Sequence, residues 1–474
     1  MKPFFRTTTR KLPVQVAFIV FLTTFLNIGS GSAQILQAPE REQLLNGLRV
    51  LIWHQPGNRD VFMSLRIHSG AAFDVAGKAG EMAVLGDILF PESTTREYFT
   101  DEMSGRLDVN TDHDSITITL QGRSDQFERI VEILRTALVT TQITPENVAK
   151  VRDGRIRLAK DSTISPAALA DRAIAARLFG DFPYGRPATG SPESLARVDR
   201  ADLLLARERF LNANNSTLTI VGGVQRNRVI RALRQLLGPW RKSEQVVPTT
   251  FRQPEPFDPR PLIINSPADQ SAEVRLAVRG LARSDADHPV TGVLAVVARQ
   301  RWEKTFPEIT RFPIFVRHEG HVLPGMFVMG AGVDTLLVGR TLASAHEVVQ
   351  SLIKTPVSTA ELDQAKAELR SQLTKDLSRP EGVARIWLDA DTFALQPVVD
   401  PILSLNAVTP ADLQRVAAKL FRASFAAVVL GDSKQLKAAL EPNTKVELMG
   451  EVERAAPTPS ETKPVMTLPP KKPE

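Results

Sequence analysis

The stretch VDRADLLLARERFLNANNSTLTIVGGV, residues 198–224, has a counterpart later in the chain. VTPADLQRVAAKLFRASFAAVVLGDS, residues 408–433, repeats its order of an Asp at a helix start, an apolar strand ending in Gly, and a further helix. Leu203 matches Leu413 at an offset of 210 residues. A repeat of this length indicates duplication of a large unit. The alternative, two unrelated helix, strand and helix endings, stays open at this point.

A proline-rich segment lies between the two copies. SEQVVPTTFRQPEPFDPRP, residues 243–261, holds five prolines and no sustained periodicity, which is typical of an extended linker. We therefore expect an N-terminal half over residues 34–242 and a C-terminal half over residues 262–450. Residues 451–474 are rich in Pro, Ser, Thr and Lys, a composition that cannot form a core and predicts a disordered tail.

Each half alternates strand and helix patterns. In DVFMSLRIHSG, residues 60–70, apolar side chains hold alternate positions: Val61, Met63, Leu65 and Ile67. The opposite positions include Arg66 and His68, so the segment has the pattern of a half-buried strand. Half-exposed strands favour mixed sheets with helices packed on one face over a fully covered parallel sheet. The predicted class is therefore α+β.

The N-terminus has the three parts of a secretory signal peptide. A basic start is followed by an apolar run over residues 14–28 and by small residues at Ser32 and Ala33. We expect cleavage after Ala33, which makes residues 1–33 a leader and predicts a periplasmic or secreted protein. An uncleaved anchor is the alternative. Polar residues interrupt the apolar run, however, and it falls short of the roughly 20 apolar residues that a stable membrane span needs.

Charge and cysteine content narrow the possible partners and sites. The formal net charge is +6, but residues 1–33 hold four Lys or Arg and no acid, so the mature chain carries +2. This charge does not imply a nucleic-acid partner. The chain has no cysteine, which excludes disulfides, thiolate ligands and a cysteine nucleophile. Any metal site would be built from His, Asp and Glu.

The segment GKAGEMAVLGDILFPES, residues 77–93, predicts a short buried helix. Met82, Leu85, Ile88 and Leu89 recur at helical spacing, which gives the helix one apolar face. Periodicity alone does not show whether this helix carries chemistry or only core.

Several longer segments are landmarks of one peptidase family. They are NGLRVLIW, LRIHSGAAFDVAGKAG, SGRLDVNTDHDSITITL and LFGDFPYGRPATGSPESLARVDRADLLLARERF. With these segments the chain resembles the pitrilysin or insulinase family of metallopeptidases, in its processing-peptidase-like subgroup, whose zinc helix carries H-x-x-E-H. The resemblance covers residues 44–440, almost the whole mature chain. It implies a duplicated two-half clamshell, each half built of mixed β-sheets with helices on one face.

The resemblance also implies that the zinc site is missing. Aligning the Leu-Phe pair that closes the motif makes residues 80–90 a degenerate zinc helix. Ala83 and Asp87 then stand at the His positions, and Gly86 stands at the Glu position. A third family ligand falls within GRIRLAK, residues 154–160, which holds no acid. A catalytic zinc characteristically has three protein ligands, so we expect no catalytic, cofactor-binding or metal residue here.

Active family members also lend an Arg and a Tyr from the second half, in a stretch resembling LREKRGLAY. The corresponding segment here is ARQRWEKTFPEI, anchored by Glu303 and Lys304, and Ile309 falls at the Tyr position. The chain has only two tyrosines, Tyr98 and Tyr184, and both precede the linker. The resemblance therefore implies that this pair is missing as well.

Two other motifs contain possible metal ligands or acid–base groups. RHEGHVLPG is flanked by Pro and Gly, which favour a turn between strands, and NTDHDS lies where a strand begins and where Asp and Asn favour turns. We interpret both as turns. A Ser-His-Asp triad is not excluded by composition, but no G-x-S-x-G elbow supports one. The candidate residues are His318, Glu319 and His321 in the first motif, and Asp112, His113 and Asp114 in the second.

Three functional hypotheses follow. The first is a catalytically silent subunit that helps an active H-x-x-E-H peptidase enclose and bind a peptide, in a periplasmic or secreted heterodimer. Zinc is then expected only in the active partner, and the peptide adds to a sheet edge within residues 105–120. The second is a structural or scaffold subunit of an envelope complex. The third is an active peptidase with relocated ligands, which requires bound zinc and cleavage that a chelator abolishes.

Overall fold

The computed structural model describes most of the chain. The described residues are 37–162, 165–244, 251–266, 271–308, 314–395, 397–440 and 444–449. The predicted leader, the predicted tail and residues 245–250 of the linker lie outside them. Among the helices that the structure describes, none combines the length and the apolar character needed to cross a bilayer.

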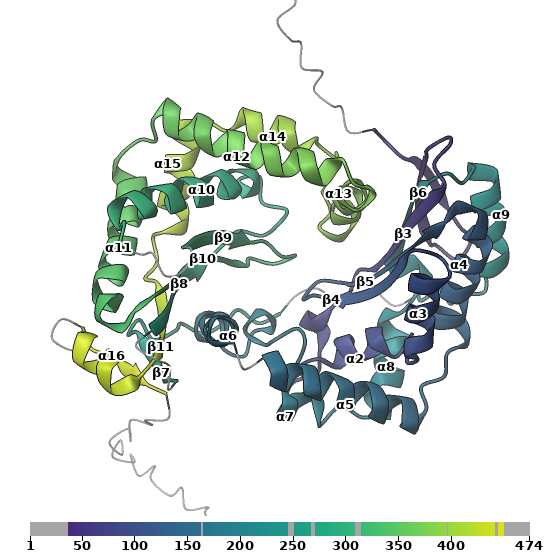
Figure 1. Cartoon of the computed structure of the whole chain (residues 1–474), viewed down its shortest axis with the longest axis horizontal. Coiled ribbons are helices and arrows are strands. Elements are labelled where there is room, and N and C mark those ends of the chain that lie inside the picture. Colours follow the sequence, from purple (N-terminus) through teal and green to yellow (C-terminus); the bar gives the residue numbers. More distant parts are fainter. Residues whose placement is uncertain are drawn as a thin grey trace, which may run out of the picture. The chain divides into compact units, whose positions relative to one another are not determined.

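The first half is built on a six-stranded mixed sheet (Figure 1). Its strands in spatial order are β1 (Glu40–Gln43), β2 (Arg49–His54), β6 (Ser216–Gly222), β3 (Asp60–Ile67), β5 (Ile116–Arg123) and β4 (Arg106–Thr111). β2 and β6 are parallel, and the other neighbours are antiparallel. Strand β4 therefore forms one edge of this sheet.

The second half repeats this sheet. Its strands in spatial order are β12 (Glu447–Leu448), β7 (Leu262–Asn265), β11 (Ala426–Gly431), β8 (Ser271–Arg279), β10 (Met326–Asp334) and β9 (Phe315–Glu319). The parallel pair β7 and β11 and the antiparallel neighbours that follow have the same order as in the first sheet. One end differs, because β1 is antiparallel to β2 whereas β12 is parallel to β7. The predicted α+β class and the duplication are confirmed.

Each half contributes helices that cover one face of its own sheet, except α6 (Pro166–Phe179) and α13 (Pro380–Thr392), which pack on the sheet of the other half. In the first half the helices are α2 (Glu81–Asp87), α3 (Ser93–Asp101), α4 (Phe127–Arg135), α5 (Pro145–Ser162), α6 (Pro166–Phe179), α7 (Pro192–Leu195), α8 (Arg200–Phe210) and α9 (Arg226–Leu236). In the second half they are α10 (His288–Thr305), α11 (Val338–Lys354), α12 (Thr359–Leu377), α13 (Pro380–Thr392), α14 (Pro401–Ala407), α15 (Pro410–Leu420) and α16 (Ser433–Leu440). The alternate apolar residues of β3 pack in the first core with α2, α4, α8 and α9.

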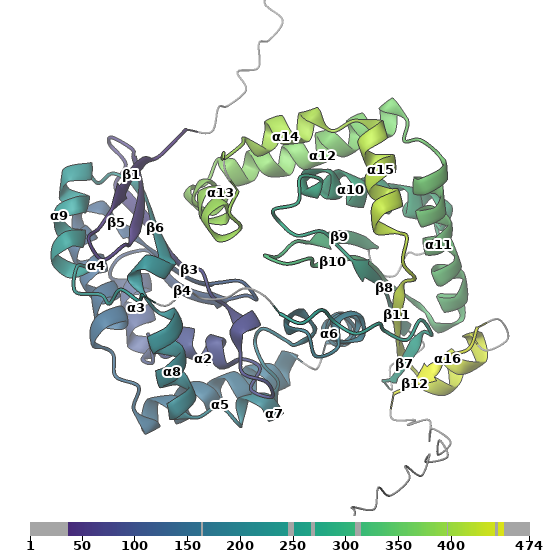
Figure 2. The ribbon, with the colours of Figure 1, turned by 180° about the vertical axis from the view of Figure 1, so that it is seen from behind.

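Two helices are exchanged between the halves (Figures 1 and 2). Helix α6, encoded in the first half, packs on β8 and β11 of the second sheet. Helix α13, encoded in the second half, packs on β3 and β6 of the first sheet. The two helices occupy corresponding places in the duplicated order. Each half therefore supplies one helix to the sheet face that the other half leaves open.

This exchange corrects the prediction that the first-half strands are half exposed. In β3, Phe62 and Ser64 point away from the first core, yet they are only 4% and 3% exposed. The reason is that α13 covers their face of the sheet. The alternation of apolar and polar residues is real, but it separates an apolar core from a polar contact between the halves.

Candidate functional site

The predicted zinc helix is present as α2, and its reactive positions hold other groups. Ala83 is fully buried, and Gly86 is buried beside it. Asp87 at the end of the helix accepts a hydrogen bond from Arg155 on α5, with 2.7 Å between Arg155 Nε and Asp87 Oδ2. The side chain of Arg155 is 12% exposed and that of Asp87 is 23% exposed. An ion pair therefore joins α2 to α5.

Gly86 lies where α2 approaches the sheet closely. A Cβ atom built on Gly86 would be 3.1 Å from Thr111 Oγ1 and 3.2 Å from the side chains of Ile116 and Val109. These distances are shorter than most real Cβ contacts, so a larger residue would require these three side chains to move by a few tenths of an ångström. The glycine is explained by helix and sheet packing.

The residues at these positions do not fit a catalytic zinc. Zinc prefers three protein ligands from His, Asp or Glu when thiolates are absent. Only Asp87 offers such a ligand here, and Arg155 places a positive charge directly on it. Arg155 belongs to residues 154–160, where the resemblance would place the third ligand. Among the described residues, no group of three or more His, Asp or Glu side chains could hold a metal ion.

The second-half segment predicted to correspond to the Arg and Tyr stretch begins on α10. Glu303 forms an exposed ion pair with Arg299 one helical turn away, with 2.7 Å between Arg299 Nη1 and Glu303 Oε1. Ile309 lies outside the described residues. Tyr98 packs beside the first core. Tyr184, by contrast, belongs to a polar cluster at the contact between the halves.

The structure brings together the two motifs that sequence analysis treated separately. Asp114, in the turn between β4 and β5, lies 2.7 Å from His321 Nδ1 through its Oδ2 atom. Its other oxygen accepts from Tyr184 OH at 3.1 Å and from the backbone N–H of Val322 at 3.2 Å. The rings of His113 and His321 have centroids 5.2 Å apart. The second motif does lie in the turn between β4 and β5. In the first motif His318 and Glu319 lie on β9, and only His321 lies in the connection that follows, so the interpretation of that motif as a turn is right only in part. Both motifs help to join the halves.

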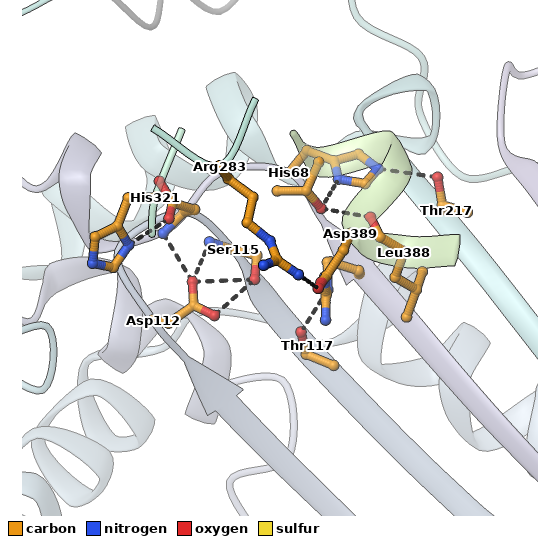
Figure 3. Close-up of polar contacts among 12 residues, drawn as sticks. His68, Asp112, Ser115, Thr117, Thr217, Arg283, His321, Leu388 and Asp389 are labelled. Carbon is orange, nitrogen blue, oxygen red and sulfur yellow. Dashed lines mark hydrogen bonds and ion pairs between the residues drawn. The ribbon is translucent and has the colours of Figure 1, made fainter. Parts of the chain in front are cut away.

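The two histidines differ in their proton affinity. Burial lowers the pKa of His321, but the hydrogen bond to Asp114 and the charges of Asp114 and Glu319 outweigh it, so the pKa lies above its usual value. Burial lowers the pKa of His113, and the neighbouring His321 lowers it further. Figure 3 shows His321 in this network, where the hydroxyl of Ser115 donates to Asp112 rather than to a histidine. The contacts around Ser115 therefore do not make a Ser-His-Asp triad.

A small cavity adjoins this cluster. Its volume is about 190 Å³, and both halves contribute to its walls. The polar side chains around it include His113, Tyr184 and Arg186 from the first half and Arg317, Glu319 and His321 from the second. Neither its size nor the meeting of the two motifs could be predicted from the sequence, because the turns that form it are far apart in the chain.

A second polar contact lies beneath α13 (Figure 3). Arg66 Nη1 on β3 lies 2.6 Å from Asp389 Oδ1 on α13. The Nδ1 atom of His68 lies 3.0 Å from Thr392 Oγ1 on α13, and its Nε2 atom lies 3.0 Å from Thr217 Oγ1 on β6. Burial lowers the pKa of His68 to about 3, with smaller contributions from the nearby charges of Arg49 and Arg66. His68 is therefore held as a neutral ring between the halves.

Comparison with protein families connects this fold to peptidases. The family model described as the Peptidase M16 inactive domain matches residues 197–299. Residues 197–299 are similar to the inactive domain of M16 peptidases. This finding confirms the predicted resemblance, and the M16 match spans the end of the first half, the linker and the start of the second half.

Individual proteins are similar to longer parts of the chain. An uncharacterized zinc protease of Rickettsia felis is 22% identical over 209 residues, which cover 43% of this chain and about half, 50%, of that protein. An uncharacterized zinc protease of Mycobacterium bovis is 23% identical over 412 residues, 83% of this chain and 93% of the relative. The human mitochondrial cytochrome b-c1 complex subunit 1 is 24% identical over 227 residues, 46% of this chain and 47% of that subunit.

Solved structures share the fold over most of the chain. A protease from Helicobacter pylori superposes with a TM-score of 0.76 at 16% identity, covering 83% of this chain and 100% of that one. A peptidase M16 inactive domain from Pseudomonas fluorescens gives a TM-score of 0.72 at 17% identity, covering 83% and 98%. At these identities the likeness shows a shared fold alone.

Proposed function

We propose that this chain is a non-catalytic M16-like subunit that pairs with an active H-x-x-E-H peptidase and helps it bind peptides. The observation that carries the proposal is the Asp87–Arg155 ion pair. It occupies the place where the family resemblance would require two zinc ligands. The rest of the fold that encloses a peptide in such a pair is retained.

Peptide binding needs no metal in this subunit. Strand β4 is an edge of the first sheet and pairs only with β5 among the described strands. An extended peptide can add to such an edge through main-chain hydrogen bonds. Asp108 and Asn110 are exposed on β4, so polar side chains border the place where the peptide would lie. We propose this edge, within residues 105–120, as the peptide-binding edge.

The proposed location of the heterodimer is the periplasm or the extracellular space. The N-terminal leader pattern supports it. Mass spectrometry of the mature N-terminus, from cells expressing the full chain, tests this part. Cleavage after Ala33 is the expected result, and an intact N-terminus in the purified protein contradicts it.

Copurification tests the partner role. The tagged chain is expressed with its chromosomal neighbours, and an H-x-x-E-H protein is expected at equal stoichiometry. Zinc should be found in that partner and not in the tagged chain alone. The proposal fails if the chain purifies alone and the active protein cleaves peptides equally well without it.

A scaffold role is the second candidate, and one comparison favours it. The cytochrome b-c1 subunit among the relatives is named as part of a respiratory complex rather than as a peptidase. If this chain has a corresponding role, the tagged protein should recover a non-peptidase assembly from the cell envelope. Recovery of an H-x-x-E-H protein instead would contradict the scaffold role.

A further inference from the structure

Arginines from several strands of the first sheet point toward α13. Arg41 on β1 lies over the ring of Trp387 at 5.0 Å, and Arg106 on β4 lies 2.7 Å from Glu381. Arg49 on β2 and Arg66 on β3 are paired with Thr217 of the intervening strand β6. Arg49 and Arg66 therefore lie in one row across the sheet. The polar face beneath α13 is a basic face.

Threonines hold the guanidinium groups of this basic face. Arg49 Nε donates to Thr217 Oγ1 at 3.2 Å, and Arg66 Nε donates to Thr117 Oγ1 at 3.3 Å. These bonds fix the inner side of each guanidinium and leave its outer N–H groups for an acceptor above the sheet. Arginine held in this way is suited to bind carboxylates.

All three acids of α13 meet polar or cationic groups of this contact. Asp389 pairs with Arg66 at 2.6 Å and with Arg283 at 3.1 Å. Asp391 accepts from Thr217 Oγ1 at 2.7 Å and lies 3.4 Å from Arg49. Glu381 accepts from Arg106. The segment that covers the basic face is thus an acidic one.

The α13 contact is more polar than its counterpart at α6. Helix α6 places Ala170, Ile174 and Leu178 in a buried apolar cluster with strands of the second sheet. Helix α13 also buries apolar side chains, Ala384, Trp387, Leu388 and Ala390, and the ring of Trp387 lies 6.0 Å from that of Trp53, but its contact with the sheet adds the ion pairs of Asp389, Asp391 and Glu381. In addition, Trp387 Nε1 is buried without a hydrogen-bond partner among the described residues. Ionic contacts weaken with competing ions and ligands, whereas apolar burial does not.

We infer that the basic face binds acidic peptide segments, and that α13 occupies this face in their place when no peptide is bound. The inference rests on the proposed peptide-binding function, adds the chemical class of the peptide, and extends its binding place from the β4 edge across the adjoining face of the same sheet. When a peptide binds, its Asp or Glu carboxylates take the places of Asp389 and Asp391 on Arg66 and Arg49. The charge complementarity already present beneath α13 supports this exchange.

The test compares peptides that differ only in charge. A labelled peptide with three Glu residues is compared with versions in which these are Gln or Lys, and binding to the full mature chain is followed by fluorescence anisotropy. The Glu peptide should bind most tightly, and its affinity should fall as salt is added. Arg66→Gln should lower that affinity about tenfold, because one charge-assisted contact is lost.

A second variant, Asp389→Asn, should raise the affinity for the Glu peptide, whereas a misfolded protein would lose it. Asp389→Asn weakens the internal competitor without changing its shape, so the affinity for the Glu peptide should rise. Asp287→Asn is the matched control, because Asp287 also pairs with two cations, Arg415 and Lys419, and neither of them lies on α13. Arg228→Gln is the control for Arg66, because Arg228 pairs with Glu128 inside the first half. Both controls should bind as the unmodified chain does.

Equal binding of the three peptides overturns the inference, as does an unchanged affinity in Asp389→Asn. Either result leaves peptide binding itself in place, so the proposed function is not affected. A charge preference in a chain that recovers no peptidase partner has the opposite meaning. It supports the basic face as a binding surface and contradicts the partner role.

Discussion

At the scale of single residues, Asp87 and Arg155 determine the chemistry of α2. The carboxylate of Asp87 is one group that could have touched a metal, and the guanidinium of Arg155 neutralises it at 2.7 Å. Both side chains are partly buried, so each depends on the other to compensate its charge. The pair therefore has a structural role that can be measured.

Arg155→Ala should destabilise the protein by about 1–2 kcal/mol, because it leaves the Asp87 carboxylate without its partner. This value lies between those of exposed and buried ion pairs. Urea unfolding measures it. The control is Arg129→Ala, which removes an exposed pair with Glu132 and should cost less than about 1 kcal/mol. If both variants lose the same free energy of unfolding, the Asp87–Arg155 pair contributes no more than an exposed surface ion pair.

The His321–Asp114 pair predicts a pH dependence. Because the folded-state pKa of His321 is raised, the stability from this pair is fully present below about pH 6.5, the ordinary histidine value. It is lost as the pH rises through the folded pKa. His321→Gln should therefore destabilise the chain more at pH 6 than at pH 9, as measured by urea unfolding at both values.

Other titratable groups around His321 require a control. Asp112 and Glu319 add negative charge near the ring, and His113 and His318 lie close to it. Asp114→Asn removes the main hydrogen-bond partner of His321 and keeps the shape of the side chain. In this background, the stability lost by His321→Gln should be nearly the same at pH 6 and pH 9. A His321→Gln effect of the same size at both pH values would contradict the prediction.

At the scale of elements, α2 shows what a sequence can and cannot predict. Its apolar face follows from the spacing of Met82, Leu85 and Ile88, which are fully buried. Periodicity and family resemblance together place the helix in the fold. They do not predict that Arg155 reaches Asp87, because α5 is far along the chain and the pairing depends on how the two helices pack.

Restoring the motif on α2 should not restore zinc binding. The triple variant Ala83→His, Gly86→Glu, Asp87→His supplies the motif, but Arg155 stays beside the new histidine and no third ligand is present. The side chain added at Gly86 would also press on Thr111 and Ile116, so the variant should lose about 1–3 kcal/mol. Zinc content by elemental analysis and urea unfolding measure the two effects.

Adding Arg155→Glu to the triple variant is the comparison. It removes the positive charge and offers a third ligand, so zinc binding should be stronger than in the triple variant. If the triple variant alone holds one zinc per chain, Arg155 is not the obstacle that the structure indicates.

At the scale of the whole molecule, the exchange of α6 and α13 joins the two halves. The sequence predicted the duplicated α+β fold, because the repeat and the strand patterns are local features. It did not predict the exchange, since each helix looks like part of its own half. The polar residues of β3, such as Arg66 and His68, were therefore assigned to solvent although α13 covers them.

His68 predicts that acid loosens the contact between the halves. Its folded-state pKa is lowered to about 3, so the contribution of the neutral ring is present above about pH 6.5 and is lost as the pH falls toward 3. Because the chain has no cysteine, labels can be placed at Gln126→Cys and Lys375→Cys, both exposed. Energy transfer between the labels should fall between pH 6.5 and 4.

His68→Gln should make this acid response smaller, because glutamine keeps hydrogen bonding but does not titrate. His346→Gln within the second half is the control, and the response should be unchanged. Energy transfer that stays constant from pH 6.5 to 4 in the unmodified chain would contradict the prediction.

The Asp87–Arg155 pair also limits the evolutionary return of a zinc site. A single substitution toward a zinc ligand at either end leaves a half-buried charge unmatched, and a larger residue at Gly86 presses on the strands. Each first step therefore lowers stability before any catalytic gain is possible. Lineages that carry this pair should therefore diversify at the surfaces that bind other molecules. The positions of the zinc motif on α2 should not regain zinc ligands.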